Sequence, residues 1–282
     1  MDHLLREPTL LAVPFFVLFI GLELVALRVL DGDEPAQGYD LKDSGASLSM
    51  GLGSVVVNLV VRTGALLGYT ALYAVTPLRL DPHRGWTWVL TILLVDLLWY
   101  AYHRSSHRVR LLWAMHQAHH SSVRFNYTTA LRQKWNPWGE LLFWVPLPLL
   151  GVAPWMIFAV FSLNLVYQFW VHTETIPKLW RPVELVFNTP SHHRVHHASD
   201  AAYLDRNYGG ILIVWDRLFG TFAEERERPT YGLTHPVTTF NPFRLQYGEL
   251  ALMLRQVRQA RRWRDRVGYL FAPPGWAPTP DA

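Results

Sequence analysis

Histidine is the residue type whose number and spacing stand out in this chain. Thirteen histidines occur among 282 residues, and most lie in three stretches that read HRSSH, HQAHH and HHRVHH. On a helix, positions i, i+3 and i+4 point to one side, so several imidazoles of one stretch can reach the same point. Neutral imidazole is a common metal ligand, whereas burying it without a partner is costly. The stretches therefore predict a metal site with the candidate ligands His103, His107, His116, His119, His120, His193, His196 and His197.

The number of these histidines favours two metal ions over one. His172, which follows a long apolar block, would be a ninth ligand. A structural zinc ion closes with four ligands, so eight or nine imidazoles overfill one ion and suit two sites of four or five each. Imidazole binds Zn, Cu, Fe and Ni alike, so the spacing leaves the element open. The chain contains no Glu-x-x-His pair of the kind that soluble helical di-iron proteins use.

The elements that must hold these histidines are apolar. Half of the residues are hydrophobic and 17% are charged, against roughly 25% in a typical soluble domain. Four apolar blocks cover residues 9–30, 52–78, 86–102 and 141–171. A membrane crossing takes about 20 residues, so the first two blocks suffice for one span each, and the third does if its helix continues past Tyr102. The fourth has Pro146, Gly151 and Pro154 near its middle, which predicts a helical hairpin.

The charges predict on which side of the membrane the histidines lie. Between Leu97 and Gly139 the chain carries six Lys or Arg residues and no acid, which favours the cytoplasmic side. We therefore predict an all-α integral membrane protein with about four spans, one of them a helical hairpin, and a cytoplasmic helical cap that carries a His-rich dinuclear metal site. The predicted parts are membrane helices (1–85), a domain that carries the histidine motifs (86–245) and a basic amphipathic helix with a Pro-rich tail (246–282).

The basic balance of the chain points to lipid rather than to nucleic acid. The isoelectric point is near 9.4, and the basic residues flank apolar spans, so lipid headgroups are the expected partners. Residues Glu249–Arg266 alternate apolar residues with six arginines, which suits either a helix on an anionic membrane surface or an ordinary solvated helix. The absence of cysteine excludes thiolate zinc sites, iron–sulfur clusters with thiolate ligands and a cysteine nucleophile.

Other polar residues are candidates for supporting the ligands. A metal-bound histidine is usually held by a hydrogen bond to its second ring nitrogen. Asp96 lies on the helix face of His103 and His107, and an acid at bilayer depth needs a partner. Gln168 lies one turn before His172, and His192 extends the third stretch. The candidate metal-binding or supporting residues outside the nine histidines are Asp96, Asn126, Gln168, Asn188, His192, Asn207 and Asp216.

The order of the motifs resembles that of the fatty acid hydroxylase/sterol desaturase superfamily. HRSSH is followed by WAMHQAHHSS, NLVYQFWVHTE, NTPSHHRVHH, NYGG and WDRLFGTF, and the resemblance covers roughly residues 90–225. The continuation YGLTHPVTTFNP is similar to the alkylglycerol monooxygenase-like branch. The family's eight-histidine motif falls on the eight histidines of the three stretches, and His172 matches an additional family histidine. Some relatives place a further histidine where this chain has Gln168.

The resemblance implies a membrane-bound, non-haem di-iron enzyme that uses O2 and two electrons to oxidise lipids. We expect it to hydroxylate, or to desaturate, a C–H bond of a fatty acyl, alkylglycerol or sterol-type substrate from the bilayer. Catalysis then belongs to the di-iron centre itself, and no separate catalytic side chain is assigned. The implied cofactors are two iron ions and O2, with tetrahydrobiopterin in the alkylglycerol-like branch, although the sequence shows no pterin motif. Electrons are expected from an external cytochrome, ferredoxin or reductase.

Other functions remain open at this point. A sterol C-5-type desaturase uses the same first step, abstraction of hydrogen. A non-catalytic membrane protein that binds or moves metal would place its ligands at mid-bilayer between broken helices, whereas these histidines lie beyond the apolar ends. Haem ligation by paired histidines suits the crowded i, i+3, i+4 spacing poorly. The expected location is the bacterial inner membrane, or the endoplasmic reticulum in a eukaryote, with the site facing the cytoplasm.

Overall fold

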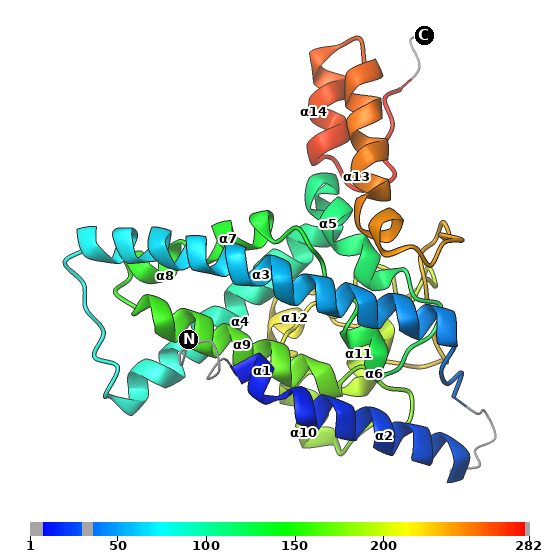
Figure 1. Cartoon of the computed structure of the whole chain (residues 1–282), viewed down its shortest axis with the longest axis horizontal. Helices are drawn as coiled ribbons and strands as arrows, with labels where there is room; N and C mark the ends of the chain where they lie inside the picture. The colour runs from blue at the N-terminus through cyan, green and yellow to red at the C-terminus, as the bar shows by residue number, and fades with distance from the viewer. Residues whose placement is uncertain (1–7, 30–35, 280–282) are drawn as a thin grey trace.

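Residues 8–29 and 36–279 are described by the computed structural model, and this part of the chain is helical and contains no β-strand. The all-α prediction is therefore confirmed. Four of the five longest helices, α2 (Val13–Val29), α3 (Leu41–Val75), α4 (Gly85–Arg108) and α9 (Pro154–Trp170), run broadly along the long axis of the molecule (Figure 1). Of these, α3 and α4 are long and apolar enough to cross a membrane.

The surface of α3 is that of a helix which faces lipid. Leu52, Val56 and Val60 follow one another at four-residue spacing, and each is at least 64% exposed. Soluble monomers rarely expose contiguous apolar stripes of this kind, whereas lipid tails cover them at no cost.

Two helix boundaries differ from the apolar blocks that predicted them. α3 begins at Leu41 rather than near residue 52, because Asp40 caps it by accepting hydrogen bonds from the backbone of Lys42 and Asp43. α4 continues past Tyr102 to Arg108, and this extension carries His103 and His107. The continuation past Tyr102 is the one that a full crossing by the third block requires, whereas the apolar count gives no sign of the earlier start of α3, because that part of the helix is polar.

Residues 141–171 form two helical arms joined by a turn. The first arm contains α7 (Trp138–Trp144) and α8 (Pro146–Leu149), and α9 is the second. Gly151 in the turn has a φ of +87°, and a Cβ there would lie 2.7 Å from the backbone of Leu78. Its carbonyl accepts a hydrogen bond from Leu80 N at 2.9 Å, so the turn is bound to the loop between α3 and α4.

The main apolar core aligns α4 with the hairpin. Val95 on α4 is packed with Trp144, Leu147, Met156 and Val160, and all five side chains are nearly inaccessible to solvent. Burial of large apolar side chains contributes about 1.5–3 kcal/mol each, so this core fixes the two helices firmly. α4 and α9 both begin near the hairpin turn and lead away from it. The histidines at or after their C-terminal ends therefore lie at the opposite end of the fold.

Short helices gather around that end, and a second hairpin projects from it. These short helices are α5 (Arg110–His120), α6 (Tyr127–Ala130), α10 (Arg181–Val186), α11 (Pro190–His196) and α12 (Val214–Leu218), whereas α1 (Pro8–Leu11) packs on α9. The projecting hairpin consists of α13 (Pro242–Gln259) and α14 (Trp263–Phe271) (Figure 1). A single helix over Glu249–Arg266 was therefore the wrong expectation, because the chain turns to extended backbone at Ala260 before helix resumes.

Candidate metal centre

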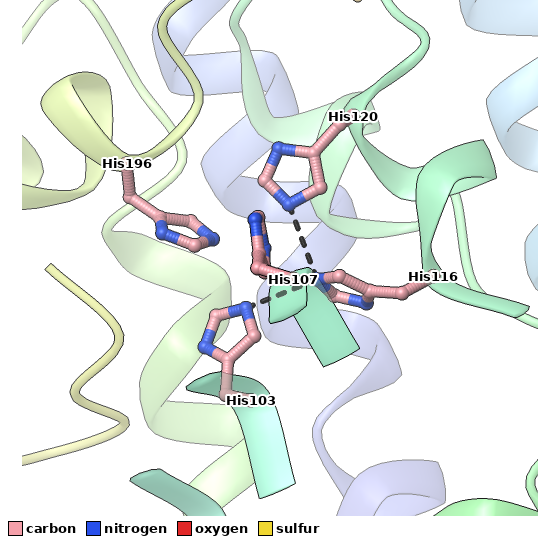
Figure 2. A group of neighbouring side chains, drawn as sticks. All are labelled: His103, His107, His116, His120 and His196. Carbon is pink, nitrogen blue, oxygen red and sulfur yellow. Dashed lines mark hydrogen bonds between the residues drawn. The ribbon is translucent and has the colours of Figure 1, made fainter. Parts of the chain in front are cut away.

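Nine histidines converge in two groups at the end of α4 and α9. The first group contains His103, His107, His116, His120 and His196, and the second contains His119, His172, His193 and His197. Within each group, one ring nitrogen of every residue lies within 4.8 Å of the others. Figure 2 shows the rings of the first group turned toward a common centre. This arrangement provides five nitrogen donors at one centre and four at the other.

Each H-x-x-H-H motif is shared between the groups. On α5, the i and i+4 residues His116 and His120 belong to the first group, while His119 belongs to the second. At α11 the assignment is reversed, because His193 and His197 belong to the second group and His196 to the first. The groups touch where the rings of His120 and His197 stack, with centroids 4.3 Å apart. The two candidate sites are therefore neighbours within one centre.

Backbone carbonyls fix the orientation of several imidazoles. Nδ1 of His103 lies 2.9 Å from the carbonyl oxygen of Tyr208, and Nδ1 of His172 lies 2.7 Å from that of Gln168. His196 Nδ1 lies 3.0 Å from the Arg206 oxygen, and His119 Nδ1 lies 3.3 Å from the Arg132 oxygen. A carbonyl oxygen can only accept, so in each neutral ring Nδ1 carries the proton and Nε2 carries the lone pair.

The remaining ring nitrogens face one another in a way that fits bound cations. Nε2 of His172 lies 3.3 Å from Nε2 of His119, and both atoms carry lone pairs by the argument above. Two lone pairs cannot form a hydrogen bond, whereas a metal ion between them accepts both. Within the described chain, Nε2 of His107, His196 and His197 is buried without any hydrogen-bond partner. The donor set therefore fits two metal ions.

The electrostatics of the centre keep these rings in the metal-binding form. Burial lowers the pKa of His172 to about 3 and that of His196 to about 4. Burial first, and neighbouring imidazoles second, also lower the pKa of five further ligand candidates far below 6.5, namely His116, His119, His120, His193 and His197. These seven imidazoles are therefore neutral at pH 7, as metal ligation requires.

Asp96 supports the centre indirectly, because it binds a nearby backbone segment rather than a histidine ring. Its carboxylate accepts hydrogen bonds from the backbone of Ile211 and Leu212, from the indole of Trp215 and from the Asn164 amide. The expectation that it orients a histidine ring was wrong, because these four donors occupy it. The acid inside α4 instead binds the segment that follows the NYGG motif.

The other predicted supporting residues also bind backbone rather than imidazole. Asp216 accepts from Tyr208 N and Gly209 N, and Asn188 donates to the Gly209 carbonyl. Asn207, at a φ of +56°, donates to the His192 and Ala223 carbonyls, while Asn126 caps α6. All four hold loop segments in place, and Asp216 thereby fixes the residue whose carbonyl orients His103.

Gln168 and His192 lie beside the nine converging histidines and belong to neither of the two groups. The Gln168 side chain donates to Asn164, and its backbone oxygen holds His172. His192 is directed toward Glu184, with its Nε2 3.0 Å from a carboxylate oxygen, and its Nδ1 lies 3.3 Å from the Thr189 hydroxyl. Because Glu184 also accepts from Ser191, this contact holds the N-terminal turn of α11.

Two buried ion pairs lie next to the centre, and the sequence pattern does not predict either of them. Arg132 is bonded to Asp43 at 2.7 Å, with both side chains at most 3% exposed, and Lys134 is paired with Glu140. In the sequence, Arg132 and Lys134 are distinguished only as two of the six basic residues that favour the cytoplasmic side. The spacing of 89 residues between Asp43 and Arg132 leaves no local sequence signal for such a pair.

Removal of the Asp216 carboxylate is expected to weaken metal binding at the first group. An Asp216→Ala variant leaves Tyr208 N and Gly209 N without their acceptor, so the carbonyl that orients His103 is released. Loss of such outer support typically costs about 10–100-fold in metal affinity. Titration against a competing chelator measures it. The matched control is Leu218→Ala, an exposed residue of the same helix, and equal affinities in both variants would contradict the assigned role.

Comparison with known proteins finds relatives of the segment that carries this centre. Residues 88–221 match the family model described as fatty acid hydroxylase. The chain is 40% identical to alkylglycerol monooxygenase of Homo sapiens over 273 residues, and 33% identical to that of Caenorhabditis elegans over 280 residues. Both matches cover 95% of this chain, but the chain spans only 59% and 53% of those relatives.

A bacterial relative is more distant, and no solved structure matches. The ornithine lipid hydroxylase OlsE of Rhizobium tropici is 31% identical over 142 residues, which covers 48% of this chain and 41% of the relative. The family match begins within α4, ends just after α12 and includes all nine converging histidines. The histidine-bearing part of the chain, residues 88–221, is therefore similar to the fatty acid hydroxylase family.

Proposed function

We propose that this chain is a membrane-bound, O2-dependent lipid oxidoreductase that hydroxylates a C–H bond of its substrate at a centre of two iron ions. The observation that carries the proposal is the convergence of nine imidazoles in a group of five and a group of four, with lone pairs of two rings facing one another. The proposed ligands are those nine histidines. The similarity to enzymes named as monooxygenases and lipid hydroxylases supports the choice of reaction.

The protein's own part in the reaction is to hold the metal ions, to orient their imidazole ligands and to shield the centre from water. Two bound iron ions would supply the O2 chemistry needed to break an unactivated C–H bond. The backbone carbonyls keep the lone pairs of His103 and His172 directed inward. Phe125 stacks on His172 and lies against His197, and Trp113 lies against His107, so aromatic side chains cover two sides of the centre and limit the entry of water.

We assign the four spans to α2, α3, α4 and the α7–α9 hairpin, with the centre on the cytoplasmic side. The ends of α4 and α9 that carry histidines lie together, and the hairpin turn is bound to the loop at the other ends of α3 and α4. In this assignment residues 1–85 are membrane helices, 86–245 the catalytic domain, and 246–282 a basic appendage. A bacterial inner membrane or an endoplasmic reticulum would both present the centre to cytoplasmic electron donors.

The proposed substrate is a lipid of the alkylglycerol or fatty acyl class. The relatives that cover most of this chain are named alkylglycerol monooxygenase, which favours an ether lipid. An external cytochrome, ferredoxin or reductase would supply electrons, and tetrahydrobiopterin is the donor to test first for an ether-lipid reaction. Desaturation is the alternative outcome of the same hydrogen abstraction.

Metal removal under controlled oxygen tests the proposed function. The purified protein in lipid nanodiscs is expected to contain two iron ions and to lose lipid oxidation completely after chelation, with recovery when iron is restored. Mass spectrometry of the lipids distinguishes a gain of one oxygen, for hydroxylation, from a loss of two hydrogens, for desaturation. Turnover that persists after verified removal of metal, or bound metal without any lipid oxidation in the presence of each donor class, would refute it.

A further inference from the structure

The projecting hairpin carries an apolar stripe that is mostly exposed, with Trp135 packed against its first two aromatic residues. Phe243, Tyr247, Leu250 and Leu254 on α13 fall within roughly 60° of one another at 100° per residue. Phe243 is 65% exposed and Leu254 is 47% exposed. The buried face of the same helix is a different one, formed by residues such as Met253. Beyond its contact with Trp135, the stripe therefore lies outside the face that packs the hairpin onto the fold.

The second helix of the hairpin repeats this feature. Trp263, Val267 and Phe271 follow one another at four-residue spacing on α14, and all three are exposed, Trp263 to 69%. None of the described residues of α14 is fully buried. Three large apolar side chains in a row on a water-exposed helix would be unfavourable, so this surface also indicates a non-aqueous neighbour.

Arginines flank these stripes. Residues 255–266 carry six arginines, at positions Arg255, Arg258, Arg261, Arg262, Arg264 and Arg266. The acids of the two helices are Glu249, which is paired with Arg110, and Asp265. On α13, Arg258 lies about 60° from Phe243 and Arg255 about 120°, so the charges border the apolar stripe on one side. The surface therefore combines apolar contact with a strong positive charge.

The stripe begins next to the lipid-facing surface of α3. The ring of Trp135 lies 5.2 Å from that of Phe243, and its indole donates to Met50 on α3. Trp135 also covers Gly53, where a Cβ would lie 2.4 Å from the ring. Leu52 beside it is 72% exposed on the proposed span. One apolar surface therefore continues from α3 through Trp135 onto α13, and Figure 1 shows the hairpin extending crosswise to α3.

We propose that the α13–α14 hairpin docks on the surface of the membrane that holds the chain, with its apolar stripes among the acyl chains and its arginines on anionic lipid headgroups. Apolar and aromatic residues on one face with arginines at its border are typical of helices that lie in the bilayer interface. An acidic protein could use the arginines but would leave the apolar continuation from α3 unexplained. This docking is independent of the proposed lipid oxidation.

Site-directed labelling tests the docking, because the chain contains no cysteine and any introduced one is unique. Leu254→Cys, on the stripe, and Gln259→Cys, about 160° from Phe243 on the same helix, carry an environment-sensitive fluorophore in the full-length protein. The protein is placed in phosphatidylcholine bilayers with or without phosphatidylglycerol, each containing brominated lipid as quencher. Quenching is expected at Leu254→Cys, more strongly with phosphatidylglycerol, and not at Gln259→Cys.

Charge removal tests the anionic part of the proposal. Each arginine near an anionic surface contributes on the order of fivefold, so Arg255→Gln with Arg258→Gln should lower the docked-to-undocked ratio roughly 25-fold in phosphatidylglycerol bilayers. Quenching that is unchanged by these substitutions would overturn the headgroup contact. A label at Leu254→Cys that stays unquenched in both bilayers, or that responds only to added polyglutamate, would overturn membrane docking in favour of an acidic partner.

Discussion

Replacement of His116 by alanine is expected to lower lipid oxidation by well over 100-fold and to remove one of two metal ions, and His193→Ala should remove the other. His116 belongs to the group of five and His193 to the group of four, and both are buried. Loss of outer support alone typically costs about 10–100-fold, so loss of a ligand should exceed that range. Metal content per chain, measured by elemental analysis beside turnover, checks both variants.

The matched control is His235→Ala, which removes an exposed histidine outside both groups. It should retain both metal ions and full turnover. If the two ligand variants kept two ions and turned over at the control rate, the nine histidines would not be the metal ligands. If each variant lost both ions together, the centre would bind its metals cooperatively rather than as two separable sites, although the ligand assignment would stand.

The grouping of the histidines could be predicted from the sequence only up to a point. Helical periodicity places His116, His119 and His120 on one side of α5, which is enough to expect that they converge. The division of this motif between two groups depends on how α5 faces α11, because each helix inserts its i+3 histidine into the other helix's group. That mutual orientation arises from packing of residues distant in the chain, so the spacing cannot contain it.

The residues that orient the rings could not be predicted for a different reason. Hydrogen bonds from His103 and His196 go to the carbonyls of Tyr208 and Arg206, and any residue type provides a carbonyl. Polar side chains such as Asp96 and Asp216 were the visible candidates, and they bind the backbone of the same loop instead. The sequence therefore identified the supporting segment while misassigning the atoms that make the contact.

The Asp43–Arg132 pair is expected to dominate the stability of the region around His119. Arg132 donates to Asp43 at 2.7 Å and to the hydroxyls of Ser47 and Ser121, and its own carbonyl holds the His119 ring. Removing one partner of a buried pair leaves an uncompensated charge, which costs about 3–5 kcal/mol. Asp43→Ala should therefore lower the free energy of unfolding by that amount and weaken metal binding by the second group. Denaturant unfolding in detergent micelles and a metal titration measure the two effects.

A double variant separates the buried charge from the packing of the side chains. Asp43→Leu with Arg132→Met removes both charges while keeping much of the volume, and such replacements are often neutral or stabilising. It should recover most of the stability lost in Asp43→Ala, since no unpaired guanidinium remains in a site where the Arg132 side chain is 1% exposed. Because the backbone carbonyl of residue 132 is retained, metal binding through His119 should return as well. A double variant as unstable as Asp43→Ala would show instead that loss of the hydrogen bonds from Arg132 to Ser47 and Ser121 costs as much as the unpaired charge that the double variant removes.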